Sequence, residues 1–199
     1  MRTLRSLTLA AALTVIAAAA AIAQPANLPI FDRKSNFDAQ HYILRVSFDR
    51  AARSVKGDTT VVLKPLAEGF SVFDLDAVGL AFSSVKLEPA GTDLKFAPIA
   101  GGVRITLDRS YSPADTISVR LKYTATPKKG IYFVNAETDP RRVMHSDQIW
   151  TQGEPEEARH WFPSFDFPSD KATTEEYITV EPGETVIGSR IALFGCAEP

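Results

Sequence analysis

The sequence predicts an all-β protein, an antiparallel β-sandwich with one short helical turn near residues 155–161. Apolar and polar side chains alternate along 41–48, 102–108 and 116–124, as a half-buried antiparallel strand requires. Glycine and proline turns separate these segments, and many short strands at this spacing favour a two-layer sandwich over a βαβ fold. Further strands are expected over 58–64, 70–76, 80–88, 93–97, 130–134, 148–151 and 176–180. The helical turn is expected at 154–160, where acidic residues and a proline open the segment.

The first 23 residues have the features of a cleaved signal peptide. Arg2 and Arg5 precede an uncharged, alanine-rich run over 7–23, and the small residues at its end place the cleavage between Ala23 and Gln24. A membrane anchor is the alternative, but the run is at the short end of the ~17–25 residues that a spanning helix needs. We therefore expect an exported protein, periplasmic or secreted, with a leader over 24–36 and one domain over 37–188.

Composition excludes several classes of function. The net charge of −2 gives no electrostatic footprint for nucleic acid or for an anionic membrane surface. No later segment is apolar enough to keep the chain in a membrane after signal cleavage. The only cysteine, Cys196, excludes both an internal disulfide framework and a multi-cysteine zinc site within one chain.

An aromatic-rich segment over 151–173 carries most of the functional information. It holds Trp161, Phe162, Phe165 and Phe167 among prolines and charged residues. Exposed loops rarely carry so many large aromatic side chains, because exposed apolar patches promote aggregation. We expect an ordered loop packed on the sandwich or against another domain.

This segment resembles the aminopeptidase N family of zinc metallopeptidases, whose members carry Thr-Gln-x-Glu, Ala-Arg, Phe-Pro-Cys-Phe-Asp-x-Pro and Lys-Ala-Thr in this order. The strands at 41–44, 57–63 and 130–133 fit the same family, and the resemblance covers about residues 36–188. Ser164 stands where many members have cysteine. The matching residues are Thr151-Gln152-Gly153-Glu154, Ala158-Arg159, Phe162-Pro163-Ser164-Phe165-Asp166-Phe167-Pro168 and Lys171-Ala172-Thr173.

The resemblance implies a saddle-shaped N-terminal sandwich that lies against a thermolysin-like catalytic domain. In the family, the glutamine and glutamate of the Thr-Gln-x-Glu loop reach the active site; carried over, these substrate-binding positions are Gln152 and Glu154. The glutamate receives the free α-ammonium of the peptide. A carboxylate facing an ammonium forms a charge-assisted hydrogen bond and rejects substrates without that charge. The alternative for Glu154 is an ordinary carboxylate at a helix start.

The family's catalytic motifs, Gly-x-Met-Glu-Asn and His-Glu-x-x-His, do not occur in this sequence. The three histidines, His41, His145 and His160, lack metal-ligand spacing, so we expect neither a zinc ligand nor a catalytic residue in this chain. Zinc belongs to the full-length family. Residues 189–199 depart from the family pattern, and a frameshift or a truncation before the catalytic domain is the hypothesis for this divergent tail.

The first functional hypothesis is therefore the substrate-amine-recognition and docking domain of an exported zinc metallo-aminopeptidase, inactive by itself. Its partners would be the missing catalytic domain and peptide N-termini. The alternative is a stand-alone β-sandwich binding module without peptidase activity. A structural sandwich of the immunoglobulin type ranks third, because its Cys…Trp…Cys core pattern is absent from a chain with one cysteine.

Overall fold

The computed structural model describes residues 33–135, 147–188 and 193–194. The chain divides after Lys34, and the fold is that of the unit Ser35–Pro199. The predicted signal peptide, with its cleavage point between Ala23 and Gln24, lies outside the described residues. No helix within the described ranges is long and apolar enough to cross a membrane.

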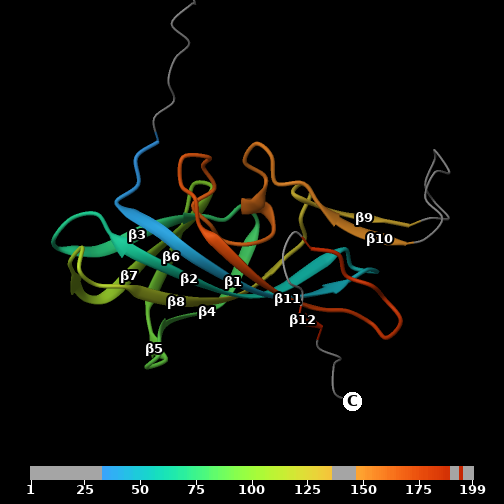
Figure 1. Cartoon of the computed structure of the whole chain (residues 1–199), viewed down its shortest axis with the longest axis horizontal. Helices are drawn as coiled ribbons and strands as arrows, with labels where there is room; N and C mark the ends of the chain where they lie inside the picture. Colours follow the sequence, from blue (N-terminus) through green and yellow to red (C-terminus); the bar gives the residue numbers. More distant parts are fainter. Residues whose placement is uncertain (1–32, 136–146, 189–192, 195–199) are drawn as a thin grey trace, which may run out of the picture. The chain divides into compact units, whose positions relative to one another are not determined.

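The described residues form three sheets, and the largest has seven strands in the order β12-β11-β1-β2-β8-β4-β5 (Figure 1). Long strands at its centre pair in antiparallel register, with Thr59 of β2 opposite Leu44 of β1 and Leu121 of β8. The strands are β1 (Phe37–Asp49), β2 (Ser54–Pro65), β4 (Leu80–Glu88), β5 (Thr92–Asp93), β8 (Ile117–Ala125), β11 (Thr173–Thr179) and β12 (Leu193–Phe194).

The second sheet has three strands in the order β3-β7-β6, and its apolar face packs on the first. A separate two-stranded ribbon pairs β9 with β10. These strands are β3 (Phe70–Asp76), β6 (Lys95–Ile99), β7 (Gly102–Tyr111), β9 (Ile131–Val134) and β10 (Gln148–Thr151).

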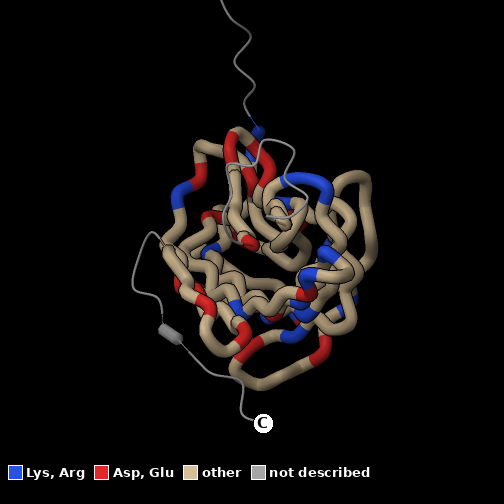
Figure 2. The backbone as a smooth tube through the Cα atoms, turned by 90° about the vertical axis from the view of Figure 1, so that its right-hand side faces the viewer, with Lys and Arg blue, Asp and Glu red and all other residues tan. Residues whose placement is uncertain are grey.

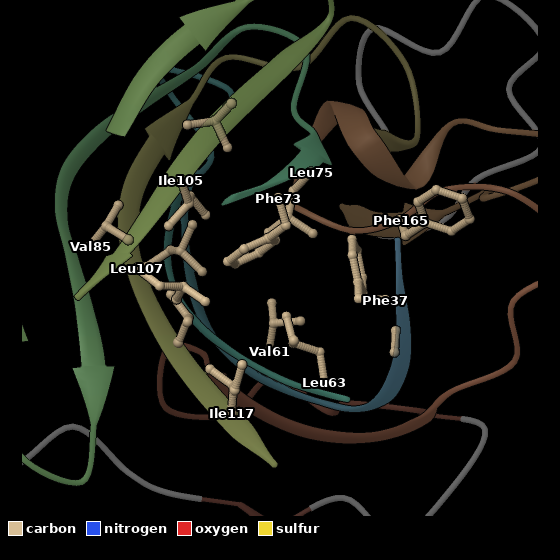
Figure 3. Packing of buried hydrophobic residues seen from close by; sticks show 14 of the residues in the cluster. Phe37, Val61, Leu63, Phe73, Leu75, Val85, Ile105, Leu107, Ile117 and Phe165 are labelled. Carbon is tan, nitrogen blue, oxygen red and sulfur yellow. The ribbon is translucent and has the colours of Figure 1, made fainter. Parts of the chain in front are cut away.

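The hydrophobic core lies between the two larger sheets (Figure 3). Side chains from both layers meet there: Val61 and Ile117 come from the seven-stranded sheet, while Phe73 and Ile105 come from the three-stranded one. Along β8, the inward-facing residues are buried and their neighbours are partly or fully exposed. The alternation of apolar and polar residues thus corresponds to strands with one face in the core of a two-layer sandwich. The predicted fold class is confirmed.

Acidic and basic residues are interspersed along the backbone of the domain (Figure 2). Several of them pair across strands: Arg120 on β8 donates two hydrogen bonds of 2.7 Å to the carboxylate of Asp58 on β2. Arg104 on β7 binds the carboxylate of Asp74, its direct neighbour on β3, in the same bidentate way at 2.8 Å. These two ion pairs therefore lie on the outer faces of the sheets, away from the hydrophobic core.

Two strand pairs differ from the antiparallel prediction. β11 runs parallel to β1, with Tyr177 opposite Arg45, and β12 runs parallel to β11. Parallel neighbours need a long connection, and residues 50–172 separate β1 from β11. The chain can therefore return to this edge in either direction. The other described strand pairs are antiparallel, as predicted.

The first strand begins at Phe37, ahead of the predicted start at His41. Phe37 and Ala39 are both buried, but a bulge lies between Ala39 and His41. A bulge inserts one residue and so shifts the alternation to the other parity. The inward positions before the bulge are therefore out of phase with Tyr42 and Leu44 after it, which hid the start of the strand.

The predicted helical turn over 154–160 is only partly correct. Its last three residues form a 3-10 helix, Ala158–His160, preceded by turn residues. Glu157 caps this helix without a side-chain hydrogen bond, and no acidic residue lies in its first turn. Glu154 precedes the helix by four positions. The alternative that Glu154 is a helix-start carboxylate is therefore wrong.

Gly57 is expected to tolerate no larger side chain. It lies opposite Tyr123, and a Cβ atom at Gly57 would lie 2.1 Å from Cζ of that ring. Tyr123 is buried and its hydroxyl is 3.1 Å from Oγ1 of Thr59, so the ring has no open space to enter. Gly57→Ala should lower the free energy of unfolding, measured by urea denaturation, by about 1–3 kcal/mol.

The matched control for this substitution is Gly153→Ala. An added Cβ at Gly153 would meet nothing within 4 Å, and this glycine does not have a positive φ. Its unfolding free energy should stay equal to that of the wild type or rise slightly, because alanine restricts the unfolded chain. Equal stabilities for the two variants would contradict the packing constraint at Gly57.

Candidate functional site

The two residues predicted to bind substrate lie in the loop that follows β10. Both side chains, Gln152 and Glu154, are exposed. The backbone of the loop is nonetheless fixed: the N–H of Gln152 donates to the carbonyl oxygen of Gly130 at 2.9 Å. The N–H of Glu157 donates to the carbonyl oxygen of Gly153, also at 2.9 Å, and closes the turn between them. The structure thus brings Gln152 and Glu154 together on an anchored loop.

Glu157 connects this loop to the start of β9. Its Oε2 accepts the N–H of Gly130 at 3.2 Å and the hydroxyl of Tyr132 at 3.1 Å, and its Oε1 lies 3.6 Å from Nζ of Lys129. Burial by itself raises the pKa of Glu157, but the two hydrogen bonds and the charge of Lys129 together hold that pKa below its ordinary value.

Gly130 is required where the loop crosses β9. Its φ of 78° lies in the left-handed region that favours glycine. A Cβ atom here would lie 2.1 Å from the carbonyl oxygen of Glu157. The glycine of the Gly130-Ile131-Tyr132 match therefore allows the close approach of two backbones.

Arg159 holds the far side of the loop. Its Nε donates to Oδ2 of Asp166 at 3.0 Å, and one terminal nitrogen donates both to Oε2 of Glu156 at 2.6 Å and to the carbonyl oxygen of Asp166 at 2.7 Å. The other terminal nitrogen lies 3.6 Å from Oδ1 of Asp76. Burial lowers the pKa of Arg159, but the hydrogen bond and charge of Asp166, with Asp76 and Glu156, shift that pKa upward overall.

Asp76 connects the loop to the sandwich. It ends β3, and it exchanges two backbone hydrogen bonds with Ser164, of 2.7 and 3.1 Å. Its Oδ2 also accepts the N–H of Asp166 at 2.9 Å. The side chain is buried, so its carboxylate needs the N–H of Asp166 and the nearby Arg159.

The aromatic side chains of the loop pack on the core, which is the first of the two arrangements that the sequence predicted. Phe165 is buried and its ring contacts that of Phe37 edge-on, with centroids 5.7 Å apart. Phe162 contacts Tyr42 in the same manner at 6.0 Å. The hydroxyl of Tyr42 accepts the N–H of Phe165 at 3.0 Å. The aromatic side chains of the loop are therefore part of the hydrophobic core, and this packing holds the loop on the sandwich.

Ser164 departs from the pattern of satisfied polar groups. Its side chain is buried, and Oγ has no hydrogen-bond partner among the described residues. This is the position at which the aminopeptidase N motif has a cysteine, a side chain of similar shape that behaves as a small apolar group. The site thus fits a thiol better than a hydroxyl.

The histidines are separated in the structure. Nδ1 of His41 lies 2.7 Å from Oγ1 of Thr173, while His160 is half-buried in the 3-10 helix, where burial lowers its pKa. His145 lies outside the described residues. Among the described residues, no group of three His, Cys, Asp or Glu side chains could hold a metal ion. These residues do not fit a zinc site, and no chemical step through zinc is assigned to them.

Sequence comparison gives the family. Residues 38–190 match the Peptidase M1 N-terminal domain. The chain belongs to this family. A search of curated proteins gives no match. The aminopeptidase N resemblance is thus confirmed at the level of the M1 peptidases.

Structural neighbours of this M1 N-terminal domain agree. An M1 zinc metallopeptidase from Deinococcus radiodurans is 26% identical, with a TM-score of 0.59 over 72% of this chain and 32% of its own. A mutant two-domain M1 zinc metallopeptidase bound to L-tryptophan is also 26% identical, with a TM-score of 0.59, and the match covers 76% of this chain and 34% of that one.

A more distant neighbour shares the fold alone. Leukotriene A4 hydrolase from Saccharomyces cerevisiae is 22% identical, with a TM-score of 0.62 over 78% of this chain and 26% of its own. The chain therefore spans about a third of the M1 zinc metallopeptidases it matches and less of this hydrolase.

Three residues of the site were missed in the sequence: Asp76, Tyr42 and Glu157. Alternation along β3 places Asp76 on the same side as the more exposed Asp74, so its burial had no local signal. Tyr42 was expected on an inward face but not as a hydrogen-bond acceptor for the loop. Glu157 is one of three acidic residues close together in 154–157, and only the fold distinguishes them.

Removing the unpaired hydroxyl should stabilise the M1 N-terminal domain. Ser164→Ala is expected to raise the free energy of unfolding by about 1 kcal/mol, because the cost of burying an unsatisfied polar group disappears. Ser112→Ala is the control: its Oγ donates to Oδ2 of Asp115 at 2.9 Å, so its loss should lower stability. Both would be measured by urea denaturation, and a loss of stability in Ser164→Ala would contradict the assignment.

Alkaline pH should loosen the loop through Tyr42. Burial raises the pKa of Tyr42 to about 12. The unfolded chain releases this proton near pH ~10, so the folded state binds more protons between about pH 10 and 12 and loses stability as the pH rises. The difference in free energy of unfolding between the wild type and Tyr42→Phe should therefore fall by up to about 3 kcal/mol as the pH rises across this window. A stability difference that is independent of pH would contradict this expectation.

Proposed function

We propose that this chain supplies the substrate-amine-recognition and docking domain of an exported zinc metallo-aminopeptidase. The observation that supports this most is the exposure of Gln152 and Glu154 on a loop whose backbone is tied to β9 and to the core. Anchored loops with exposed polar side chains are suited to recognition, because little entropy is lost when they bind.

The chemistry of the two side chains fits a free α-ammonium. The carboxylate of Glu154 can accept a charge-assisted hydrogen bond from the ammonium, and the amide of Gln152 supplies both a donor and an acceptor for the adjacent peptide unit. An N-acylated peptide lacks the positive charge and would leave the carboxylate without its partner. This difference in affinity would restrict the enzyme to peptide N-termini.

The docking partner would be the catalytic domain of an M1 zinc metallopeptidase, which would supply the zinc and the reacting groups. The solved relatives are zinc metallopeptidases of about three times the matched length. We call the loop that carries Gln152 and Glu154 the recognition loop. Next to it, Trp150 stacks on Tyr132 with ring centroids 4.5 Å apart, and its side chain is 43% exposed. An exposed aromatic pair of this kind is typical of protein interfaces.

The alternative, a stand-alone binding module, is favoured by one observation: the described residues form a hydrophobic core between two sheets of their own. Both candidates share the recognition loop and differ in whether a catalytic domain is present. Export to the periplasm or the medium remains part of the proposal and rests on the signal-peptide features of residues 1–23.

Reading the gene downstream of residue 188 distinguishes the two candidates. An open frame that encodes Gly-x-Met-Glu-Asn followed by His-Glu-x-x-His would support the enzyme domain. A stop codon followed by unrelated sequence would overturn it in favour of the binding module.

In the enzyme that carries the catalytic domain, Glu154→Gln is expected to lower kcat/KM for an alanine anilide by about 10- to 100-fold, because the hydrogen bond to the ammonium loses its ionised acceptor. Hydrolysis kinetics of the free-amine and N-acetylated anilides would measure it. Glu68→Gln, an exposed carboxylate in the turn between β2 and β3, is the matched control and should leave kcat/KM unchanged. Equal values for wild type and Glu154→Gln would contradict amine recognition.

A further inference from the structure

The side chain of Glu157 joins two segments that are distant in the sequence. Its Oε2 accepts hydrogen bonds from the N–H of Gly130 and the hydroxyl of Tyr132, which lie at the start of β9. Lys129, with Nζ 3.6 Å from Oε1, neutralises the carboxylate on its other oxygen. The carboxylate of Glu157 thus has three partners, Lys129, Gly130 and Tyr132, around the start of β9.

The backbone of Glu157 is bound to the recognition loop itself. Its N–H donates to the carbonyl oxygen of Gly153, the residue between Gln152 and Glu154. Its carbonyl oxygen accepts the N–H of His160 at 3.2 Å. The same residue therefore binds β9 through its side chain and both halves of the loop through its main chain.

We propose that Glu157 is a positioning residue, whose carboxylate fixes the recognition loop against β9 and so sets the place of Gln152 and Glu154. The functional meaning of this role rests on the proposed function, while the role itself is a property of the loop. Without the carboxylate, the N–H of Gly130 and the hydroxyl of Tyr132 lose their acceptor. The backbone hydrogen bond from Gln152 to Gly130 and the pairing of Thr151 with Ile131 would then remain to hold this end of the loop to β9.

The aromatic pair gives this proposal a spectroscopic reporter. Tyr132 donates to Glu157 through its hydroxyl and stacks on Trp150 with an interplanar angle of 20°. Loss of the hydrogen bond frees the Tyr132 ring to change its angle to Trp150. The near-ultraviolet circular dichroism of the chain should therefore respond to substitution at Glu157.

The test compares Glu157→Ala with Glu157→Gln in the full chain, by amide hydrogen exchange followed by NMR. We expect Glu157→Ala to accelerate exchange of the Gln152 and Gly130 amides by about tenfold, with unchanged exchange for core amides of β2 and β8. Glutamine keeps an oxygen acceptor for both donors, so Glu157→Gln should restore most of the protection and of the near-ultraviolet signal. Glu157→Met, which fills a similar volume without an acceptor, should exchange as fast as Glu157→Ala, because the hydrogen bonds and not the volume of the side chain fix the loop.

Glu156→Ala is the matched control. Its carboxylate contacts Arg159 on the other side of the loop, so the Gln152 amide should keep its wild-type exchange rate. The proposal is overturned if Glu157→Ala leaves the Gln152 amide unchanged, if Glu157→Gln exchanges as fast as Glu157→Ala, or if core amides accelerate to the same extent.

Failure of this proposal is separable from failure of the proposed function. Amide exchange reads the position of the loop in the chain and needs no peptide or catalytic domain. The anilide kinetics of Glu154→Gln read amine recognition and leave Glu157 intact. An ordered loop without amine selectivity would overturn the function only, whereas amine selectivity with a loop indifferent to Glu157 would overturn the positioning role only.

Discussion

The site depends on one buried carboxylate, that of Asp76 at the end of β3. Its backbone pairs in both directions with Ser164, and its side chain accepts the N–H of Asp166. A buried charge is stable only where donors and an opposite charge satisfy it, and Arg159 provides that charge. Removing one member of such a set is costly, because the remaining charges stay buried without compensation. The aromatic-rich segment over 151–173 is therefore joined to the sandwich by polar contacts as well as by apolar packing.

The contacts of Asp76 with Asp166 and Arg159 limit how far the loop with Gln152 and Glu154 can move. Arg159, in the 3-10 helix, binds both Glu156 and Asp166. The helix and the aromatic residues that follow it are therefore held at the same place. Glu157 supplies a second fixed point at β9. A loop held at both ends can expose two polar side chains without collapsing onto the sheet, which is the arrangement that a binding site requires.

Sequence patterns predicted the strands well, because alternation reports directly which face of a strand is buried. They failed where the fold changes that relation. The bulge after Ala39 reverses the phase of β1, and the parallel strand β11 is paired with β1 through contacts that no local pattern encodes. The aromatic segment was correctly predicted to be ordered, since its four large side chains had to be buried somewhere. Its partners, Phe37 and Tyr42, become visible only in three dimensions.

The candidate site shows the same division. Gln152 and Glu154 were found by resemblance, because both belong to a motif that can be read along the chain. Asp76 and Glu157 were not, since alternation placed the first on an outward face and nothing local distinguished the second from Glu156. Each acts by joining segments far apart in sequence, Asp76 to Asp166 and Glu157 to Gly130. Positions that belong to a family motif can be recognised along the chain, whereas residues that hold such positions in place depend on tertiary neighbours and require the structure.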